Sequence, residues 1–225
     1  MERFFDKRFV VLVGNYGSGK TELALNLAFA SAARMTATLV DLDIVNPYFR
    51  SGEKAEALRQ AGIRVLTPTF AMSTVDIPAL PAEIQSVFET PCDRVIFDVG
   101  GDDTGAAALG RYAPSFQRFR EDVQTVLVVN TMRPLTQTAE DIIELARRIE
   151  ARGRLPIDAI INNTNLADLT EIDMLRKGDA IVREAAAALG VTRVAAAGEE
   201  MALRGMTGVV LPIRRHMQPE WMVDA

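Results

Sequence analysis

The 225-residue chain has one cysteine, Cys92, and one histidine, His216. A single cysteine excludes an intrachain disulfide and any CxxC metal or cluster site made within one chain. Long apolar runs are also missing, because no stretch approaches the roughly 20 residues that a membrane-spanning helix needs. Residues 1–7, MERFFDK, lack the apolar core of a signal peptide, so we expect a cytoplasmic protein.

Positive charge is scarce, because 30 Asp and Glu residues outweigh 25 Lys and Arg residues and give a net charge of −5. An acidic chain has no general attraction for nucleic acid, and the basic cluster Arg214–His216 is short. Pro212 and Pro219, with the acids that follow them, interrupt any basic amphipathic helix that would bind a membrane surface. We therefore expect neither nucleic acid nor a membrane as a partner.

Apolar runs alternate with segments of helical spacing along the chain. The expected strands are Phe9–Val13, Ala37–Asp41, Arg64–Leu66, Arg94–Val99, Thr125–Asn130, Ala159–Asn162 and Arg193–Ala196. The expected helices are Thr21–Ala33, Ser51–Ala61, Ala79–Glu89, Thr138–Arg152 and Ile172–Leu189. The strand runs are continuously apolar, as strands buried on both faces require. The alternation predicts a single α/β domain over residues 1–225, with a doubly wound, mostly parallel sheet of about seven strands and helices on both faces.

The most informative feature is the octapeptide that follows the first expected strand. Its residues are Gly14, Asn15, Tyr16, Gly17, Ser18, Gly19, Lys20 and Thr21. A glycine-rich turn between a strand and a helix directs backbone N–H groups and the positive helix end toward a phosphate chain. In this pattern Lys20 supplies a cation to the β- and γ-phosphates, and the Thr21 hydroxyl is a ligand of Mg²⁺. The octapeptide predicts a phosphate-binding loop for a nucleotide, with Lys20 in a catalytic role.

Three aspartates follow expected strands, at the edge where an open parallel sheet binds its ligands. Asp41 and Asp43 end the second strand, and their spacing places both on one side of an extended chain. Asp98 ends the fourth strand and precedes Gly100 and Gly101. We expect Asp98 to reach Mg²⁺ through water and the Gly101 N–H to meet the γ-phosphate. The acids at 41 and 43 would hold a Mg²⁺-bound water or orient the attacking water, unless they are solvated turn acids.

The end of the sixth expected strand carries three candidates for contact with the base, Asn162, Asn163 and Asn165. Guanine readers have Asn-Lys-x-Asp at this place, and the final carboxylate accepts both N–H groups of the guanine edge. Here Asn163 stands at the Lys position and Asn165 at the Asp position. A neutral amide cannot accept two bonds in that way, whereas it pairs bidentately with N6 and N7 of adenine. The sequence therefore favours ATP over GTP, together with Mg²⁺.

These parts together resemble one branch of the P-loop NTPases. The phosphate loop, Asp41-Leu42-Asp43, Asp98-Val99-Gly100-Gly101 and Asn162-Asn163 are similar to those of the MinD/ParA/CobQ-like branch, the SIMIBI class. The runs Asp43–Arg50 and Asp98–Asp102 look more closely like those of uncharacterised bacterial ATP/GTP-binding proteins of that branch. The resemblance spans nearly the whole chain, from residue 8 to about residue 200.

The resemblance implies a nucleotide sandwich dimer that hydrolyses ATP slowly to drive a protein partner. It also implies that Asp43 is the catalytic, water-positioning acid and that Asp41 lies nearer the metal. Members of the branch that use a signature lysine carry it directly after the first glycine of the loop, and this chain has Asn15 there. The cross-subunit lysine is absent, so any homodimer would form without that contact.

Two roles found in the branch need ligands that this chain does not have. Cluster-assembly ATPases use paired cysteines, and nickel-insertion GTPases use Cys and His near the switch region. With Cys92 and His216 as the sole such residues, neither site can be built within one subunit.

Two hypotheses of different class remain. The first is a regulatory or chaperone-like ATPase, in which the loops after Asp43 and Asp98 switch the affinity for a protein partner. The second is a small-molecule enzyme, either a kinase or an ATP-dependent ligase of the cobyrinate diamide or dethiobiotin synthetase kind. Such an enzyme needs an acceptor pocket beside the γ-phosphate. The arginines that would line it, unless they are ordinary surface charges, are Arg50, Arg111, Arg118 and Arg133.

Overall fold

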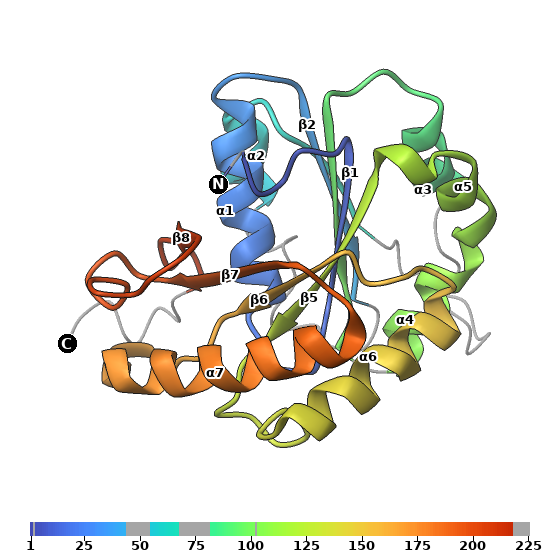
Figure 1. Cartoon of the computed structure of the whole chain (residues 1–225). Helices are drawn as coiled ribbons and strands as arrows, with labels where there is room; N and C mark the ends of the chain where they lie inside the picture. The colour runs from blue at the N-terminus through green and yellow to red at the C-terminus, as the bar shows by residue number, and fades with distance from the viewer. Residues whose placement is uncertain (2, 44–54, 68–81, 102, 218–225) are drawn as a thin grey trace, which may run out of the picture.

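The computed structural model describes residues 1, 3–43, 55–67, 82–101 and 103–217. Its centre is an eight-stranded sheet in the order β3-β2-β4-β1-β5-β6-β7-β8 (Figure 1). The strands are β1 (Phe9–Val13), β2 (Ala37–Leu42), β3 (Arg64–Leu66), β4 (Arg94–Val99), β5 (Val123–Val129), β6 (Ala159–Asn162), β7 (Arg193–Gly198) and β8 (Val210–Pro212). Every neighbouring pair is parallel, so the carboxyl ends of all the strands meet at one edge.

Helices cover both faces of the sheet. They are α1 (Lys20–Ala32), α2 (Ala55–Gln60), α3 (Ala82–Gln85), α4 (Asp103–Arg111), α5 (Ala113–Arg118), α6 (Ala139–Gly153) and α7 (Ile172–Leu189), with 3-10 turns η2 (Ser86–Phe88), η3 (Arg120–Asp122) and η4 (Ala167–Leu169). Leu23 of α1 and Leu58 of α2 belong to the apolar cluster on one face. Leu109 of α4, Leu145 of α6 and Val182 of α7 belong to the cluster on the other, which is the lower face in Figure 1.

The predicted α/β fold, with a parallel sheet and helices on both faces, is confirmed. All residues of β1, β2, β4 and β5 are buried, which explains why apolar residues predominate in these strands, although β2, β4 and β5 also contain buried polar residues. The observed ends of the predicted strands and of α1, α6 and α7 lie within two residues of the expected ones. The expected helices at 51–61 and 79–89 correspond to α2 and to α3 with η2, and residues 51–54 and 79–81 lie outside the described residues.

Two α-helices and one strand were not predicted. β8 adds an eighth strand at the edge of the sheet, where three residues ending in proline give no periodic signal. The helix α4 contains two glycines, Gly105 and Gly110, and α5 begins with a proline in its first turn. The glycines lower the helix propensity of α4, whereas a proline in the first turn, as in α5, is well tolerated. α4 packs against α6, β2 and β4, so tertiary contacts stabilise it more than its composition does.

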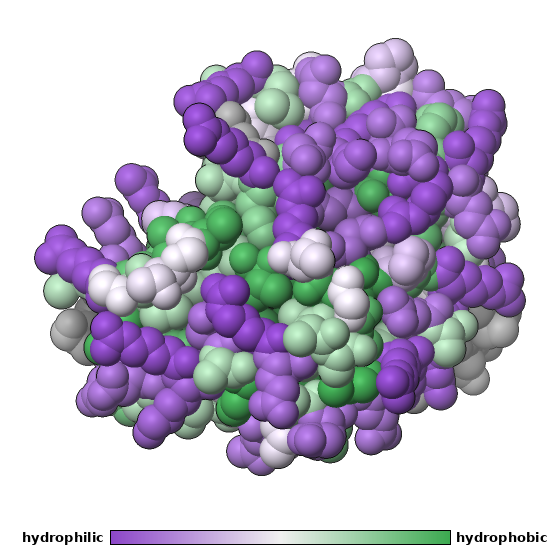
Figure 2. Space-filling model, viewed as in Figure 1, coloured by the Kyte–Doolittle hydropathy of each residue, from purple (hydrophilic) through white to green (hydrophobic). Residues whose placement is uncertain are grey.

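The exterior is mixed in character. Figure 2 shows hydrophilic side chains over most of the face seen in Figure 1, with apolar residues exposed among them. No helix in the described ranges is both long enough and apolar enough to cross a bilayer.

Candidate functional site

The phosphate loop, Gly14–Thr21, connects β1 to α1 at the middle of the sheet. β1 ends at Val13 and α1 begins at Lys20, so Thr21 lies in the first helical turn. Gly19 precedes α1 in a left-handed conformation with φ of 89°, and a Cβ there would lie 2.2 Å from Nδ2 of Asn163. Only glycine fits such a position, so the backbone of the loop packs directly against the residue that follows β6.

Lys20 lies within the phosphate loop, with 6% of its surface exposed. Its Nζ donates a hydrogen bond of 3.0 Å to the carbonyl oxygen of Asn15, across the loop. The ammonium is therefore held beside the loop backbone, within reach of a phosphate chain that the loop would bind.

Asp41 and Asp98 lie side by side on neighbouring strands. β2 and β4 pair with Asp41 opposite Asp98, and both carboxyl groups are buried. Leu39 and Ile96, two residues earlier on the same strands, belong to the apolar cluster beneath α1. Because side chains alternate along a strand, both carboxyl groups face the α1 side of the sheet, where Thr21 starts its helix.

The carboxyl group of Asp98 has a strongly shifted pKa. Burial raises its pKa from an ordinary 3.8 to about 6. A hydrogen bond from the Thr21 side chain and the charge of Lys20 lower the pKa, whereas the charge of Asp43 raises it. These contacts bring Lys20, Thr21, Asp43 and Asp98 together around the start of α1, although they come from three segments far apart in the sequence.

The oxygen atoms of this group fit a magnesium ion. Oδ2 of Asp98 is buried and has no hydrogen-bond partner among the described residues, and the Thr21 hydroxyl lies next to the same carboxyl group. Mg²⁺ is usually held by one or two carboxylates, substrate phosphates and several waters, so a larger cage of side chains is not needed. Asp41 accepts the backbone N–H of Asp43 at 2.9 Å and so shapes the turn that carries Asp43. In the part of the chain that the structure describes, no cluster of three or more His, Cys, Asp or Glu offers another metal site.

The turn Val99–Gly101, which follows Asp98, lies directly against the phosphate loop. A Cβ on Gly101 would lie 2.6 Å from the backbone N and 2.7 Å from the Cα of Tyr16. A Cβ on Gly100 would lie 3.3 Å from Oδ1 of Asp43. The turn therefore contacts both the phosphate loop and Asp43. A ligand that displaces one of these three parts would also displace the other two.

We predict that Gly101→Ala weakens binding of a non-hydrolysable ATP analogue by about tenfold or more, while ADP affinity changes less. The added methyl group separates the turn from the loop backbone, and the Gly101 N–H is expected to serve only the γ-phosphate. Calorimetric titration of both nucleotides measures the difference. Gly153→Ala is the matched control, because its methyl group would meet only the flexible end of Leu109. Equal losses for ATP analogue and ADP would contradict the assignment of Gly101 to the γ-phosphate.

The three asparagines near the end of β6 use their amides inside the protein. Asn162 donates to the carbonyl oxygen of Leu175 and accepts the N–H of Thr164. Asn163 donates to the carbonyl oxygen of Ser18 in the phosphate loop, at 2.8 Å. Asn165 donates to the carbonyl oxygen of Asn163 and accepts the N–H of Ala167. They join the loop after β6 to the phosphate loop and to α7, and their contact with a base stays a prediction.

The turn after β5 also belongs to the site, and of its residues only Arg133 had been named from the sequence, as a candidate for an acceptor pocket. Asn130 is buried at the end of this strand, donates to the carbonyl oxygen of Asn165 and accepts two backbone N–H groups. Asn15 donates to the carbonyl oxygen of Pro134 at 2.8 Å, and Nε of Arg133 donates to the carbonyl oxygen of Gly17 at 3.3 Å. Asn130 could have been found from the sequence, because it is a polar residue directly after an expected apolar strand. Asp41 and Asp98 were selected by that criterion.

Exposed apolar side chains gather on the loops at this edge of the sheet. Tyr16 of the phosphate loop is 60% exposed and Leu135 of the turn after β5 is 62% exposed. Met132 of the same turn, Leu169 of η4 and Met201 after β7 are exposed as well. Tyr16 and Leu135 also line the same pocket, and exposed apolar side chains that lie together are typical of an interaction surface.

A pocket of about 350 Å³ lies behind the first half of the phosphate loop, on the face away from α1. It is lined by Gly14–Tyr16, by the turn Val99–Gly101, by Ala106 of α4, and by residues of α6 that include Arg148 and Ile149. The pocket therefore touches both parts of the site that are expected to contact the γ-phosphate.

Comparison with solved structures places the chain among P-loop NTPases in fold. The 54 kDa protein of the signal recognition particle from Aeropyrum pernix K1, in complex with GDP, is 25% identical, with a TM-score of 0.53 over 87% of this chain and 42% of that chain. Cell division protein FtsY from Thermotoga maritima is 17% identical, with a TM-score of 0.54 over 84% of this chain and 62% of that chain. FlhF complexed with GMPPNP and Mg²⁺ is 17% identical, with a TM-score of 0.50 over 80% of this chain and 62% of that chain.

The chain thus has the nucleotide-binding P-loop NTPase fold and is structurally similar to SIMIBI-class members at low identity. It spans less than half of the first of these chains and less than two thirds of the other two. No protein-family model matches the sequence, and no curated protein matches it. The run Ile44–Arg50, which contributes to the resemblance noted from the sequence, lies outside the described residues.

Proposed function

We propose that this protein binds ATP with Mg²⁺ in the phosphate loop, hydrolyses it slowly, and uses the change of nucleotide as a switch for a protein partner. The observation that carries this proposal is the group formed by Lys20, Thr21 and Asp98 at the start of α1, in which a buried carboxyl group lies beside a threonine hydroxyl. A hydroxyl and an acid in this arrangement hold Mg²⁺ in P-loop NTPases.

Each residue has a distinct task in the proposed reaction. Mg²⁺, when bound, neutralises charge on the β- and γ-phosphates, and the Thr21 hydroxyl and Asp98 hold it. Lys20 carries its ammonium to the same phosphates, and the Gly101 N–H donates to the γ-phosphate. Asp43 orients the attacking water, a role supported by its position between the Asp98 carboxyl group and the turn that contains Gly100.

The choice of ATP over GTP rests on Asn165. A carboxylate at that position would accept both N–H groups of the guanine edge, and an amide cannot. The related structures of the signal recognition particle protein and of FlhF hold GDP and GMPPNP, respectively. Because these proteins are at most 25% identical to this chain, their nucleotides do not indicate which base this chain binds. Stabilisation by ATP that exceeds stabilisation by GTP in a thermal unfolding series is the expected outcome.

A protein partner is supported by the apolar side chains around the phosphate loop. Tyr16 lies in the loop itself, and Leu135 lines the same pocket as Tyr16. A partner that covers them would contact the elements that respond to the γ-phosphate, so its affinity would depend on the nucleotide. A second copy of the chain is one such partner. Asn15, at the place of the signature lysine, bonds Pro134 of its own chain, so a dimer would rest on the apolar contacts.

We predict that Asp43→Asn keeps ATP affinity within about twofold of the parent and lowers the hydrolysis rate by roughly 100-fold, the typical contribution of a positioned acid–base group. Phosphate release under single-turnover conditions measures the rate, and calorimetry measures the affinity. Asp173→Asn, an exposed acid on α7, is the control and should change neither. Unchanged turnover in Asp43→Asn would remove Asp43 from the mechanism.

A second candidate function, a small-molecule kinase or ligase, is favoured by the pocket behind the phosphate loop. The pocket meets Gly101 and would place an acceptor next to the γ-phosphate. Among the arginines named for this role, Arg133 contacts the phosphate loop, whereas Arg118 covers the ring of Phe119 near the start of β1, at the opposite edge of the sheet. Arg50 lies outside the described residues. A burst of ADP that depends on an added metabolite and needs no protein partner would favour this candidate.

A further inference from the structure

A short segment after β8, Ile213–Met217, crosses the flank of α1, and we call it the C-terminal strap. Asn26 of α1 exchanges two hydrogen bonds of 2.8 Å with the backbone of Arg214. The carboxylate of Glu22 accepts the backbone N–H groups of His216 and Met217, and the His216 ring stacks on Phe29. Because Arg214 lies at Asn26 and Met217 at Glu22, the strap runs antiparallel to α1 and reaches the first turn of the helix at Glu22.

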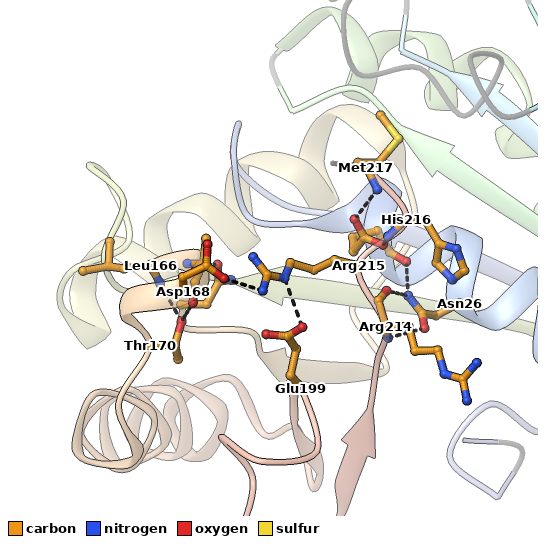
Figure 3. Close-up of polar contacts among 12 residues, drawn as sticks. Asn26, Leu166, Asp168, Thr170, Glu199, Arg214, Arg215, His216 and Met217 are labelled. Atoms are coloured by element: carbon orange, nitrogen blue, oxygen red, sulfur yellow. Dashed lines mark hydrogen bonds and ion pairs between the residues drawn. The ribbon is translucent and has the colours of Figure 1, made fainter. Parts of the chain in front are cut away.

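Arg215 reaches from the strap in the opposite direction, away from α1 (Figure 3). Its Nε donates to the carboxylate of Glu199 at 3.0 Å, and its Nη2 forms an ion pair with Asp168. Glu199 directly follows β7, and Asp168 lies in η4, three residues after Asn165. The hydrogen bonds that Arg215 donates to Asp168 and Glu199 raise the pKa of Arg215, and the same contact with Arg215 lowers the pKa of Asp168. The guanidinium plane is thus fixed between the loops that follow β6 and β7.

The sheet order indicates which part of a nucleotide would lie near Arg215. The phosphate loop follows β1, and the acids Asp98 and Asp41 lie on β4 and β2, on one side of it. On the other side β5, β6 and β7 follow in turn, and their carboxyl ends carry Asn130, the asparagines at 162–165 and Glu199. With the metal on the β4 side, a nucleotide bound along this edge extends its base toward the ends of β6 and β7. Arg215 spans the space between those two strand ends.

Two amide side chains of the loop after β6 already donate hydrogen bonds to the protein backbone. The amides of Asn163 and Asn165 bond the backbone of the phosphate loop and of their own loop. A base held there needs a surface to stack on as well as any edge contact. A guanidinium plane provides such a surface, because Arg stacks on the π-faces of aromatic rings and of bases.

We propose that Arg215 forms the stacking wall of the base subsite, with Asp168 and Glu199 holding its guanidinium in the plane required. This inference rests on the proposed function, since it concerns the base end of the same nucleotide. Stacking accepts any purine, so Arg215 would supply affinity for the base while Asn165 limits the preference for guanine. The strap would then be a part of the nucleotide site that β8 and α1 bring to this edge.

The test compares a ligand that has a base with one that has none. A non-hydrolysable ATP analogue and inorganic tripolyphosphate, each with Mg²⁺, are titrated into the full chain. Arg215→Ala should weaken the ATP analogue by about tenfold and leave tripolyphosphate unchanged. Arg215→Lys keeps the charge without the plane and should lose nearly as much. Arg214→Ala is the matched control from the same strap, because its side chain points away from Arg215 (Figure 3) and should change neither ligand.

Several outcomes would overturn the proposal. Equal losses for both ligands would mean that Arg215 only holds the strap in place, and tighter binding of the ATP analogue by Arg215→Ala would mean that Arg215 blocks the subsite. An affinity of Arg215→Lys for the ATP analogue equal to that of the parent would mean that the positive charge contributes to binding and that stacking on the guanidinium plane does not. If Arg215→Ala does not fold, Asp168→Asn tests the same plane by removing one of its two holding carboxylates, and an unchanged affinity for the ATP analogue would contradict the proposal. A parent chain that binds neither ligand would contradict the proposed function itself, a distinct result.

Discussion

Replacing Asp98 by asparagine should stabilise the nucleotide-free protein at pH 7 while it removes the effect of Mg²⁺ on nucleotide affinity. Burial raises the pKa of this carboxyl group from 3.8 to about 6, so at pH 7 the folded protein holds a buried charge. A pKa shift of this size corresponds to roughly 3 kcal/mol of free energy. This value is the upper limit of the stability that Asp98→Asn gains over the parent. Asparagine keeps the shape of the side chain, and its amide carries no charge.

The sign of the pH dependence follows from proton binding. Between pH 3.8 and about 6 the folded state keeps a proton on Asp98 that the unfolded state has lost. The contribution of Asp98 to the unfolding free energy therefore falls as pH rises through this window, and it stays low above it. The gain of Asp98→Asn over the parent should thus be small near pH 4 and largest near pH 7. Denaturant unfolding of both proteins at several pH values measures this difference.

Asp93→Asn is a control with the opposite sign. The Thr36 hydroxyl and backbone N–H hydrogen-bond the Asp93 carboxylate and lower its pKa, so its charged form stabilises the fold. Asp93→Asn should be less stable than the parent near pH 7, and the difference should shrink as pH falls below the ordinary pKa. If Asp98→Asn is instead less stable than the parent near pH 7, as expected for Asp93→Asn, the carboxyl group of Asp98 is not a buried charge without a compensating partner.

The second large effect is expected for Lys20→Ala, which should abolish the thermal stabilisation of the protein by Mg²⁺ and ATP. A ligand present at 100 times its dissociation constant stabilises the native state by about 2.7 kcal/mol, and the variant should lose nearly all of this. The physical reason is the loss of the one side-chain cation that the phosphate loop holds in its interior. Differential scanning fluorimetry with and without ligand gives the comparison.

Lys177→Ala is the matched control for Lys20→Ala, because Lys177 is an exposed lysine on α7. It should retain the full stabilisation by ATP. Stabilisation of the Lys20→Ala variant equal to that of the parent would show that phosphate does not bind in the loop between β1 and α1.

Local patterns were enough to predict the sheet and the phosphate loop. β1, β4 and β5 are buried on both faces, and each contains a run of at least three consecutive apolar residues that the sequence shows directly. The glycine spacing of Gly14–Thr21 is recognisable within the loop itself, although the residues that exclude a Cβ at Gly14 and Gly19, Val128 and Asn163, lie far away in the sequence. In contrast, β8 owes its place to pairing with β7, and α4 to packing on α6, and neither contact has a signature within its own segment.

Side-chain direction was the part that the sequence could not provide. The amide of Asn163 points at the carbonyl oxygen of Ser18, 145 residues earlier in the chain, and a strand-end motif does not reveal such a partner. Arg215 belongs to a short basic cluster that composition would assign to a solvated tail. Its partners, Glu199 and Asp168, lie 16 and 47 residues away in sequence. Contacts between residues this far apart in the sequence depend on the fold of the whole chain.

The central claim, that this chain binds a magnesium nucleoside triphosphate at the start of α1, is tested most directly by calorimetric titration of a non-hydrolysable ATP analogue into the parent protein with and without Mg²⁺. We expect one site per chain and an affinity that falls by at least about tenfold when Mg²⁺ is removed, because the negative charges of the triphosphate and of Asp98 then face each other without the metal. The absence of binding, or an affinity that is the same with and without Mg²⁺, would contradict this claim.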